Sequence, residues 1–172
     1  MEAKKYRLTE THINIGEKIL YQIKALKDFG KVKAGDLGGY IESEENLSQY
    51  DNAWVYDNAE VYDDAEVFDN AEVFDNAKVF DNARVYGDAW VYGSAQIKSV
   101  RDYIVFKNWW SSGRYFTWTR SNNMWKVGCF FGTGEELIKK AYNDSKESGR
   151  EYERIVRYVE EILEENYENK ED

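Results

Sequence analysis

The chain has 172 residues, enough for one domain with a hydrophobic core or for two small ones. Its formal net charge of −10 argues against a general nucleic-acid binder, because contact with phosphates requires basic surface. A single cysteine excludes an intrachain disulfide framework, and the sequence shows neither a membrane-length apolar run nor a secretory apolar segment, so we expect a cytoplasmic protein.

Residues 1–48 are predicted to form an N-terminal strand segment and an irregular capping coil. Strands are expected at 5–9 and 18–26, since apolar residues alternate with polar ones in the second segment. Residues 11–16 between them are predicted to form a turn or loop. Three apolar residues of the irregular coil are expected to point inward: Val32, Ile41 and Leu47.

Residues 53–97 repeat a six-residue pattern, of which Ala59-Glu60-Val61-Tyr62-Asp63-Asp64 is typical. A fixed period indicates that each unit is one structural step and that neighbours stack to bury a common core. Side chains alternate across a strand, so the alanine and valine are predicted to point inward, and the acidic and aromatic residues outward.

The corners between strands carry Asp, Asn or Gly, which tolerate left-handed backbone angles at low cost. Carboxylates at these corners could also bind calcium, but turn chemistry explains them and they are spread over three edges, so no metal site is expected. The corner aspartates are Asp51, Asp57, Asp63, Asp69, Asp75 and Asp81.

This repeat resembles the hexapeptide family, whose chains wind as a left-handed parallel β-helix with three hexads per turn. The segment Tyr21–Phe29, followed by Gly35–Ser48, is similar to the start of the YdcK-like group of hexapeptide-repeat proteins, which are frequent in phages and prophages. The resemblance implies a short β-helix over residues 49–100. It implies no particular activity and carries no functional residues.

With three hexads per turn, residues 18 apart stack about 4.8 Å from one another and form three walls. Two walls pair acid with base, as in Glu60 with Lys78, whereas the first wall is almost wholly aromatic. We expect this wall to be covered, either by the chain's own flanking segments or by a partner, and the resemblance implies a homotrimer. The predicted oligomer or partner interface is Trp54, Tyr56, Glu72, Phe74, Trp90 and Tyr92.

Residues 101–172 are predicted to form an α+β module with an antiparallel meander and two α-helices, which caps the other end of the β-helix. The module resembles one attached to hexapeptide repeats in many phage proteins. Short polar turns separate the three expected strands, which are 102–107, 115–119 and 124–130.

Capping boxes predict where the two helices begin. Thr133 and Glu136 form the first box, and Ser148 and Glu151 form the second. The acidic tail 164–172 is expected to fray.

Two groups of side chains were weighed for chemistry. Hexapeptide acyltransferases need a histidine base, and the one histidine, His12, lies outside the repeats in the predicted loop, so neither catalysis nor a cofactor is expected. Paired tryptophans beside arginines could stack a nucleotide base and hold its phosphate, although packing against the β-helix is the commoner fate of such rings. These candidate ligand-binding residues are Trp109, Trp110, Arg114 and Arg120.

The sequence thus predicts a mainly β protein, a short left-handed parallel β-helix with an α+β cap. Its expected role is that of a non-catalytic phage-type binding protein, a homotrimer that counters host defence by gripping a host protein or sequestering a small nucleotide. The alternatives are an acidic mimic of nucleic acid, a structural assembly protein and a transferase-like enzyme.

Overall fold

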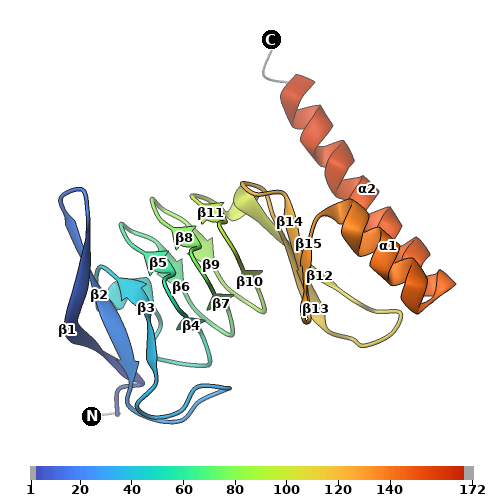
Figure 1. Ribbon diagram of the computed structural model, residues 1–172. Helices are drawn as coiled ribbons and strands as arrows, with labels where there is room; N and C mark the ends of the chain where they lie inside the picture. The colour runs from blue at the N-terminus through green and yellow to red at the C-terminus, as the bar shows by residue number, and fades with distance from the viewer. Residues whose placement is uncertain (1–2, 169–172) are drawn as a thin grey trace.

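The structure is a computed structural model that describes residues 3–168. Three parts follow one another along a common axis (Figure 1). Antiparallel strands lie at the N-terminal end, short parallel strands wind through the middle, and a second antiparallel sheet backed by two helices lies at the C-terminal end. This arrangement confirms the predicted fold class, a short parallel β-solenoid followed by an antiparallel sheet and two helices.

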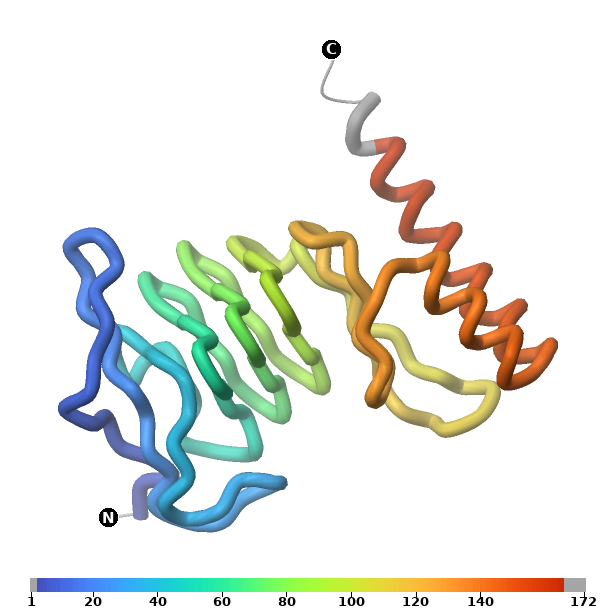
Figure 2. Tube along the Cα trace, viewed as in Figure 1, coloured from blue at the N-terminus to red at the C-terminus, as the bar shows by residue number. Residues whose placement is uncertain are grey.

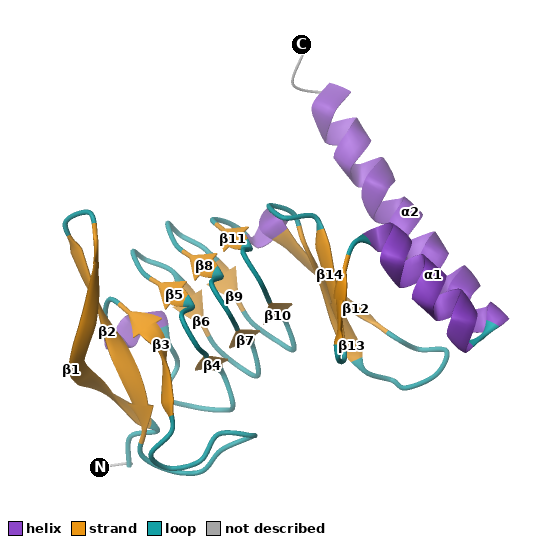
Figure 3. Ribbon diagram, in the orientation of Figure 1, coloured by secondary structure: helices purple, strands orange, loops and turns teal. Residues whose placement is uncertain are grey.

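Eight two-residue strands build the solenoid (Figure 3). Residues 18 apart pair in parallel, so that Trp54 lies beside Glu72 and Glu72 beside Trp90, and three six-residue repeats therefore make one turn. Each column of strands forms one wall. The strands are β4 (Trp54–Val55), β5 (Glu60–Val61), β6 (Glu66–Val67), β7 (Glu72–Val73), β8 (Lys78–Val79), β9 (Arg84–Val85), β10 (Trp90–Val91) and β11 (Gln96–Ile97).

The corners behave as their composition predicts. All six corner aspartates have φ between 53° and 59°, and Gly87 and Gly93 take the equivalent positions in the last turn with φ of 65° and 69°. This left-handed conformation places consecutive strands on different walls. Every alanine and valine of the repeats is buried, as is the final Ile97, so the solenoid interior is a continuous column of small and β-branched side chains.

Outward side chains stack in vertical ladders on each wall. The predicted acid and base pairs form, with 2.7 Å between Lys78 Nζ and Glu60 Oε2 and 3.4 Å between Arg84 Nε and Glu66 Oε2. Most aromatic rings one turn apart lie nearly parallel, as Tyr62 and Phe80 do with centroids 5.2 Å apart, whereas the planes of Phe74 and Tyr92 are tilted by 42°.

The N-terminal strands extend one wall of the solenoid. β1 (Tyr6–Ile15) pairs with β2 (Lys18–Ala25), β2 pairs with β3 (Leu37–Ile41), and β3 runs parallel to β5. The prediction of a loop at 11–16 was wrong, because β1 continues through an irregularity between Leu8 and His12 and turns only at Gly16. Val32, Ile41 and Leu47 are buried as predicted.

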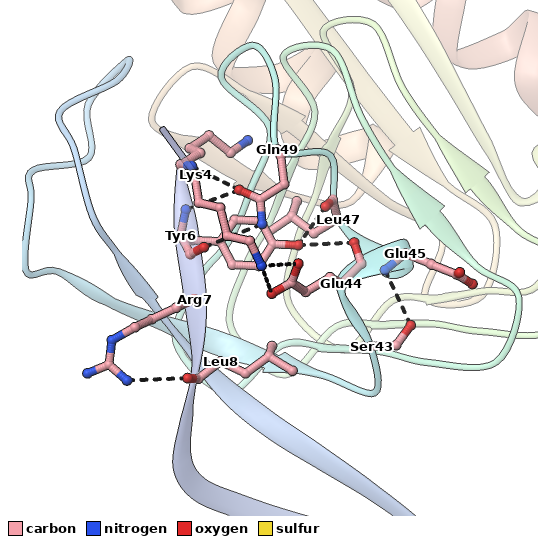
Figure 4. A network of polar contacts seen from close by, with 10 residues as sticks. Lys4, Tyr6, Arg7, Leu8, Ser43, Glu44, Glu45, Leu47 and Gln49 are labelled. Atoms are coloured by element: carbon pink, nitrogen blue, oxygen red, sulfur yellow. Dashed lines mark hydrogen bonds and ion pairs between the residues drawn. The ribbon is translucent and has the colours of Figure 1, made fainter. Parts of the chain in front are cut away.

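Polar side chains close this end of the solenoid (Figure 4). The Tyr6 hydroxyl donates to the carbonyl oxygen of Leu47 at 2.6 Å, and Gln49 Oε1 accepts from the Lys5 amide at 2.8 Å. The buried Lys5 ammonium donates to the carbonyl oxygens of Tyr50 and Ala53, and burial lowers its pKa to about 8. A short 3₁₀ helix (Glu44–Asn46) completes the cap.

The C-terminal sheet has four strands in chain order, one more than predicted. Val127 ends the third strand, and a turn with Gly128 at φ 56° starts a fourth that the sequence analysis had merged with it. A 3₁₀ helix (Val100–Asp102) connects this sheet to the solenoid. The strands are β12 (Tyr103–Lys107), β13 (Tyr115–Thr119), β14 (Met124–Val127) and β15 (Phe130–Gly132).

Side chains of the segment 117–121 contact the last turn of the solenoid. The Trp90 amide donates to Thr117 Oγ1 at 2.9 Å, and the Gln96 amide donates to Ser121 Oγ at 2.6 Å. These oxygens replace the carbonyl groups that a further turn would supply. The predicted capping role of the C-terminal sheet is therefore visible in its hydrogen bonds.

Two helices pack together beyond the sheet, and the second is much the longer (Figure 1). α1 (Gly134–Asp144) begins at the predicted capping box of Thr133 and Glu136. α2 (Lys146–Glu168) begins before the predicted box at Ser148, whose amide instead donates to Ser145 Oγ. The predicted fraying tail 164–172 lies partly in α2, and its last four residues lie outside the described residues. Over residues 3–168 no helix is long and apolar enough to cross a membrane.

Candidate ligand-binding site

The structure places the six predicted interface residues on one wall. Trp54, Glu72 and Trp90 lie in paired strands, and Tyr56 stacks on Phe74 with ring centroids 4.5 Å apart. Tyr92 continues this ladder at 5.0 Å from Phe74. We call this surface the aromatic wall.

Segments of the same chain cover much of the aromatic wall. Trp54 is only 1% exposed, because the rings of Tyr6 and Phe29 pack edge-on against it at 6.0 and 5.3 Å. Trp54 is therefore buried within one chain and is not available to a second subunit. The other aromatic residues of the wall are half-buried.

The loop between β2 and β3, residues 26–36, extends from the N-terminal end along the solenoid (Figure 2), and we call it the arm. Backbone bonds in both directions between Phe29 and Val32 make its tip a tight turn at Gly30 and Lys31. Asp28 Oδ1 accepts from the Ala34 amide at 2.8 Å and stiffens the base of this turn. The arm thereby holds Lys31 in a defined position.

The Lys31 ammonium reaches residues of two different turns of the aromatic wall. It lies 4.7 Å from the centre of the Trp90 ring and 3.7 Å from Glu72 Oε2. Burial raises the pKa of Glu72, and the charge of Lys31 opposes that shift. A cation over an indole face is attracted by the ring quadrupole, so Trp90 and Glu72 together fix the tip of the arm.

A second cation approaches the wall from the C-terminal sheet. Lys126 Nζ lies 4.1 Å from the centre of the Tyr92 ring, and burial lowers its pKa. Phe131 packs on the same tyrosine with centroids 5.1 Å apart. The last turn is thus held between the arm and the C-terminal sheet.

A pocket of about 470 Å³ opens where the arm, the last turn and the C-terminal sheet meet. We call it the basic pocket, since its lining includes two cations and one carboxylate. Its residues come from the tip of the arm, a corner of the solenoid, β10, the start of β13 and the turn after β14. They are Lys31, Asp88, Trp90, Arg114, Tyr115 and Gly128.

The structure keeps Trp109 and Trp110 in edge-on contact, with ring centroids 6.0 Å apart, but does not bring all four predicted ligand-binding residues together. Trp110 packs into the core between the sheet and α2, 4.8 Å from the Tyr152 ring, and its Nε1 is buried with no hydrogen-bond partner among the described residues. Trp109 is 70% exposed. Arg120 lies beyond the opposite end of β13, where its Nε donates to the Arg101 carbonyl oxygen. Of the four, Arg114 lines the basic pocket.

The structure also shows where His12 and the corner aspartates lie. His12 lies in β1 rather than in a loop, and its Nδ1 is 3.0 Å from the Glu10 carbonyl oxygen. Among the side chains that the structure describes, no group of three acidic, histidine or cysteine side chains is arranged to hold a metal ion. The left-handed φ at each corner aspartate is the role that the structure shows for these residues.

Sequence reasoning missed four of the six lining residues: Lys31, Asp88, Tyr115 and Gly128. One signal was present, because the corner dipeptide changes from Asp-Asn to Gly87-Asp88 in the last turn, next to the pocket. The position of Lys31 has no such signal, since it depends on the direction that the arm takes.

A scan of protein-family models finds no match to this chain, and a comparison with curated protein sequences finds no match either.

Proposed function

We propose that this protein is a non-catalytic binding protein that sequesters a small nucleotide in the basic pocket. The observation that carries the proposal is the meeting of three segments that are far apart in the sequence around one opening of about 470 Å³; they contribute Lys31, Trp90, and the neighbouring pair Arg114 and Tyr115. An acidic chain that gathers two cations beside two aromatic rings has the composition of an anion site for a flat ligand.

The roles of these groups follow from their chemistry. Arg114 offers a planar fork of N–H donors that matches a phosphate, and Lys31 adds a point charge already steadied by Trp90 and Glu72. Tyr115 is 45% exposed, so its ring offers a face on which a base can stack. The carboxylate of Asp88 accepts N–H groups at the edge of that base.

A finer identity belongs to the same proposal. The 18-residue turn and the left-handed corner aspartates support a left-handed hexapeptide-repeat protein of the YdcK-like, phage or prophage type. In that setting, removing a nucleotide signal counters a host defence without any chemical step. Binding of a host protein is the other way in which the protein would counter a host defence. This alternative is tested by capture of that host protein on the immobilised chain.

Self-association as a homotrimer is also proposed. Its support is the resemblance, together with the half-buried rings of Tyr56, Phe74 and Tyr92 on the aromatic wall. Light scattering on the purified protein measures the mass directly. A monomer at all concentrations would remove the trimer from the proposal without touching the basic pocket.

Isothermal titration with AMP, GMP and UMP tests nucleotide binding. Ribose 5-phosphate and adenosine each supply half of the ligand, so both are expected to bind at least ten times more weakly than AMP. Arg114→Ala is expected to weaken AMP binding at least tenfold. Arg7→Ala removes another exposed arginine, which lies in β1, and is expected to leave the affinity unchanged.

Two results would overturn the proposal. One is the absence of binding by all three mononucleotides and by the dinucleotide probe described below. The other is binding that Arg114→Ala and Arg7→Ala weaken to the same extent, because the basic pocket would then play no part.

A further inference from the structure

The aromatic ladders of the three walls end differently at the C-terminal side of the solenoid. On the aromatic wall, Phe131 from the C-terminal sheet packs on Tyr92 as one more rung. On the wall of Tyr62 and Phe80, the Lys98 ammonium covers Phe80 at 5.3 Å from the ring centre. These two ladders are therefore closed by residues of the chain.

The third ladder is open. Phe68 and Tyr86 stack with centroids 5.2 Å apart and ring planes within 9° of each other. Among the side chains that the structure describes, those of residues 3–165, Phe68 is the one aromatic side chain whose ring packs on Tyr86, and Tyr86 is 46% exposed. The face of Tyr86 that points away from Phe68 thus has no aromatic ring stacked on it.

A second pocket, of about 430 Å³, lies at this open rung. We call it the ring pocket. Aliphatic and tyrosine side chains dominate its lining, and no lysine or arginine is among the residues that line it, so it suits an uncharged flat group. Its residues are Tyr86, Gly87, Asp88, Val100, Tyr103, Ile104, Val105 and Tyr115.

The ring pocket and the basic pocket adjoin. Asp88 and Tyr115 line both of them, so one ligand passing these two residues can occupy the two spaces together. The two cations that line the cavity belong to the basic pocket, and the open tyrosine rung belongs to the ring pocket. A third cation, the Lys107 ammonium, lies 5.8 Å from the centre of the Tyr115 ring at their boundary. The charge distribution therefore predicts a phosphate at one end and a second ring at the other.

We infer that the ligand is a dinucleotide, whose phosphate and first nucleoside occupy the basic pocket and whose second base stacks on Tyr86 as the missing rung. This inference rests on the proposed function and names its ligand class. Any base can stack on an exposed aromatic face. The presence of a second base is therefore expected to affect the affinity more than the identity of the two bases.

Titration with 5′-phosphorylated diadenylate and with AMP tests the inference. The dinucleotide is expected to bind about 5- to 150-fold more tightly than AMP, the factor that corresponds to about 1–3 kcal/mol of base stacking on an aromatic side chain. Val100→Glu places a charge in the ring pocket at a residue that is 51% exposed. This variant is expected to abolish the gain of the dinucleotide and to leave AMP affinity unchanged.

Ile19→Glu is the matched control, because Ile19 is also an exposed aliphatic residue, at 44%, and lies in β2, outside the arm and both pockets. Equal affinities for AMP and the dinucleotide, or a gain that survives Val100→Glu, would overturn the inference and leave the proposed function standing. Loss of binding by every nucleotide would overturn the proposed function itself. A tight dinucleotide complex that weakens with both Arg114→Ala and Val100→Glu supports both.

Discussion

Individual side chains supply the hydrogen bonds that a further solenoid turn would otherwise supply. Thr117 Oγ1 accepts a hydrogen bond from the amide of Trp90, which lies in β10 and lines the basic pocket. A buried amide without an acceptor is costly, so this hydroxyl stabilises the junction between the last turn and the C-terminal sheet, together with Ser121 Oγ.

We predict that Thr117→Val destabilises the protein by about 1–3 kcal/mol, because valine keeps the shape of threonine but cannot accept the amide. Thr117→Ser keeps an oxygen and is expected to cost less. Urea denaturation followed by tryptophan fluorescence measures both. Equal losses for the two variants would show that packing, and not the hydrogen bond, carries the effect.

Buried tyrosines predict how stability depends on alkaline pH. Burial raises the pKa of Tyr103 to about 12, and its hydroxyl donates to the Arg84 carbonyl oxygen at 2.9 Å. The unfolded chain ionises this tyrosine near pH 10. The stability contributed by the neutral hydroxyl is therefore complete below pH 10 and is lost as pH rises from about 10 to 12.

Tyr103→Phe is expected to cost about 1 kcal/mol near pH 7, through loss of the hydrogen bond, and to reduce the further loss above pH 10. Urea denaturation at pH 8, 10 and 11 gives, for the wild type and for Tyr103→Phe, the slope of the free energy of unfolding against pH. Burial also raises the pKa of Tyr6 and Tyr56, so some alkaline loss remains in the variant. Identical slopes for the two proteins would contradict the role given to Tyr103.

At the scale of the elements, one glycine allows the C-terminal sheet to sit on the solenoid. A Cβ built on Gly93 would lie 2.6 Å from Phe131 Cζ, whereas a Cβ built on Gly87 meets no described atom within 4 Å. Both glycines have the left-handed φ that corner aspartates adopt elsewhere in the repeats. Only the position under Phe131 therefore needs glycine for reasons of space.

Gly93→Asp is expected to be about 1–3 kcal/mol less stable than Gly87→Asp, the cost of forcing extra atoms into a packed contact. Both variants place aspartate at a left-handed φ and lose the same small amount of backbone free energy. The difference between their stabilities therefore measures the clash with Phe131. Thermal denaturation by circular dichroism measures it. Equal melting temperatures would mean that β15 shifts without cost.

Periodicity predicted the elements of the solenoid but not every element outside it. The spacing of valine and alanine was sufficient to predict the walls, the interior and the corners of the solenoid, because every hexad repeats the same residue types. Gly128 looked like part of a strand because apolar residues continue on both sides of it, yet its positive φ separates β14 from β15. Ser145 and Ser148 are both good caps, and the sequence does not rank them.

The candidate site was predicted only in fragments. Trp90 and Arg114 were named in two unrelated groups, and a local pattern cannot show that β10 and the start of β13 share a pocket. The four predicted ligand-binding residues do not converge on one place, because Trp110 turns into the core against Tyr152 while Arg120 lies past the far end of β13. Such convergence depends on how non-repeating segments fold back, which periodicity does not specify.

At the scale of the whole molecule, the solenoid should tolerate loss of a complete turn. Deleting residues 67–84 joins Glu66 to Val85, keeps every remaining residue on its own wall and lets both ends keep their caps. Deleting residues 67–75 removes half as much chain but leaves a hexad of three residues, which cannot close a turn.

The 18-residue deletion is therefore expected to unfold cooperatively, with a smaller urea dependence because it buries less surface. The nine-residue deletion is expected to be less stable or unfolded. Far-UV circular dichroism and urea titration compare them. A more stable nine-residue variant would contradict the three-hexad turn as the unit of stability.

The length of the arm is matched to the number of turns in the solenoid. Lys31 starts from the N-terminal end but touches Glu72 and Trp90, which belong to successive turns. Each turn lengthens the axis by a fixed step of about 4.8 Å, so turn number and arm length have to be matched. A variant with an inserted turn would carry Trp90 out of range of a lysine on an unchanged arm, and a longer arm would be needed to restore their contact.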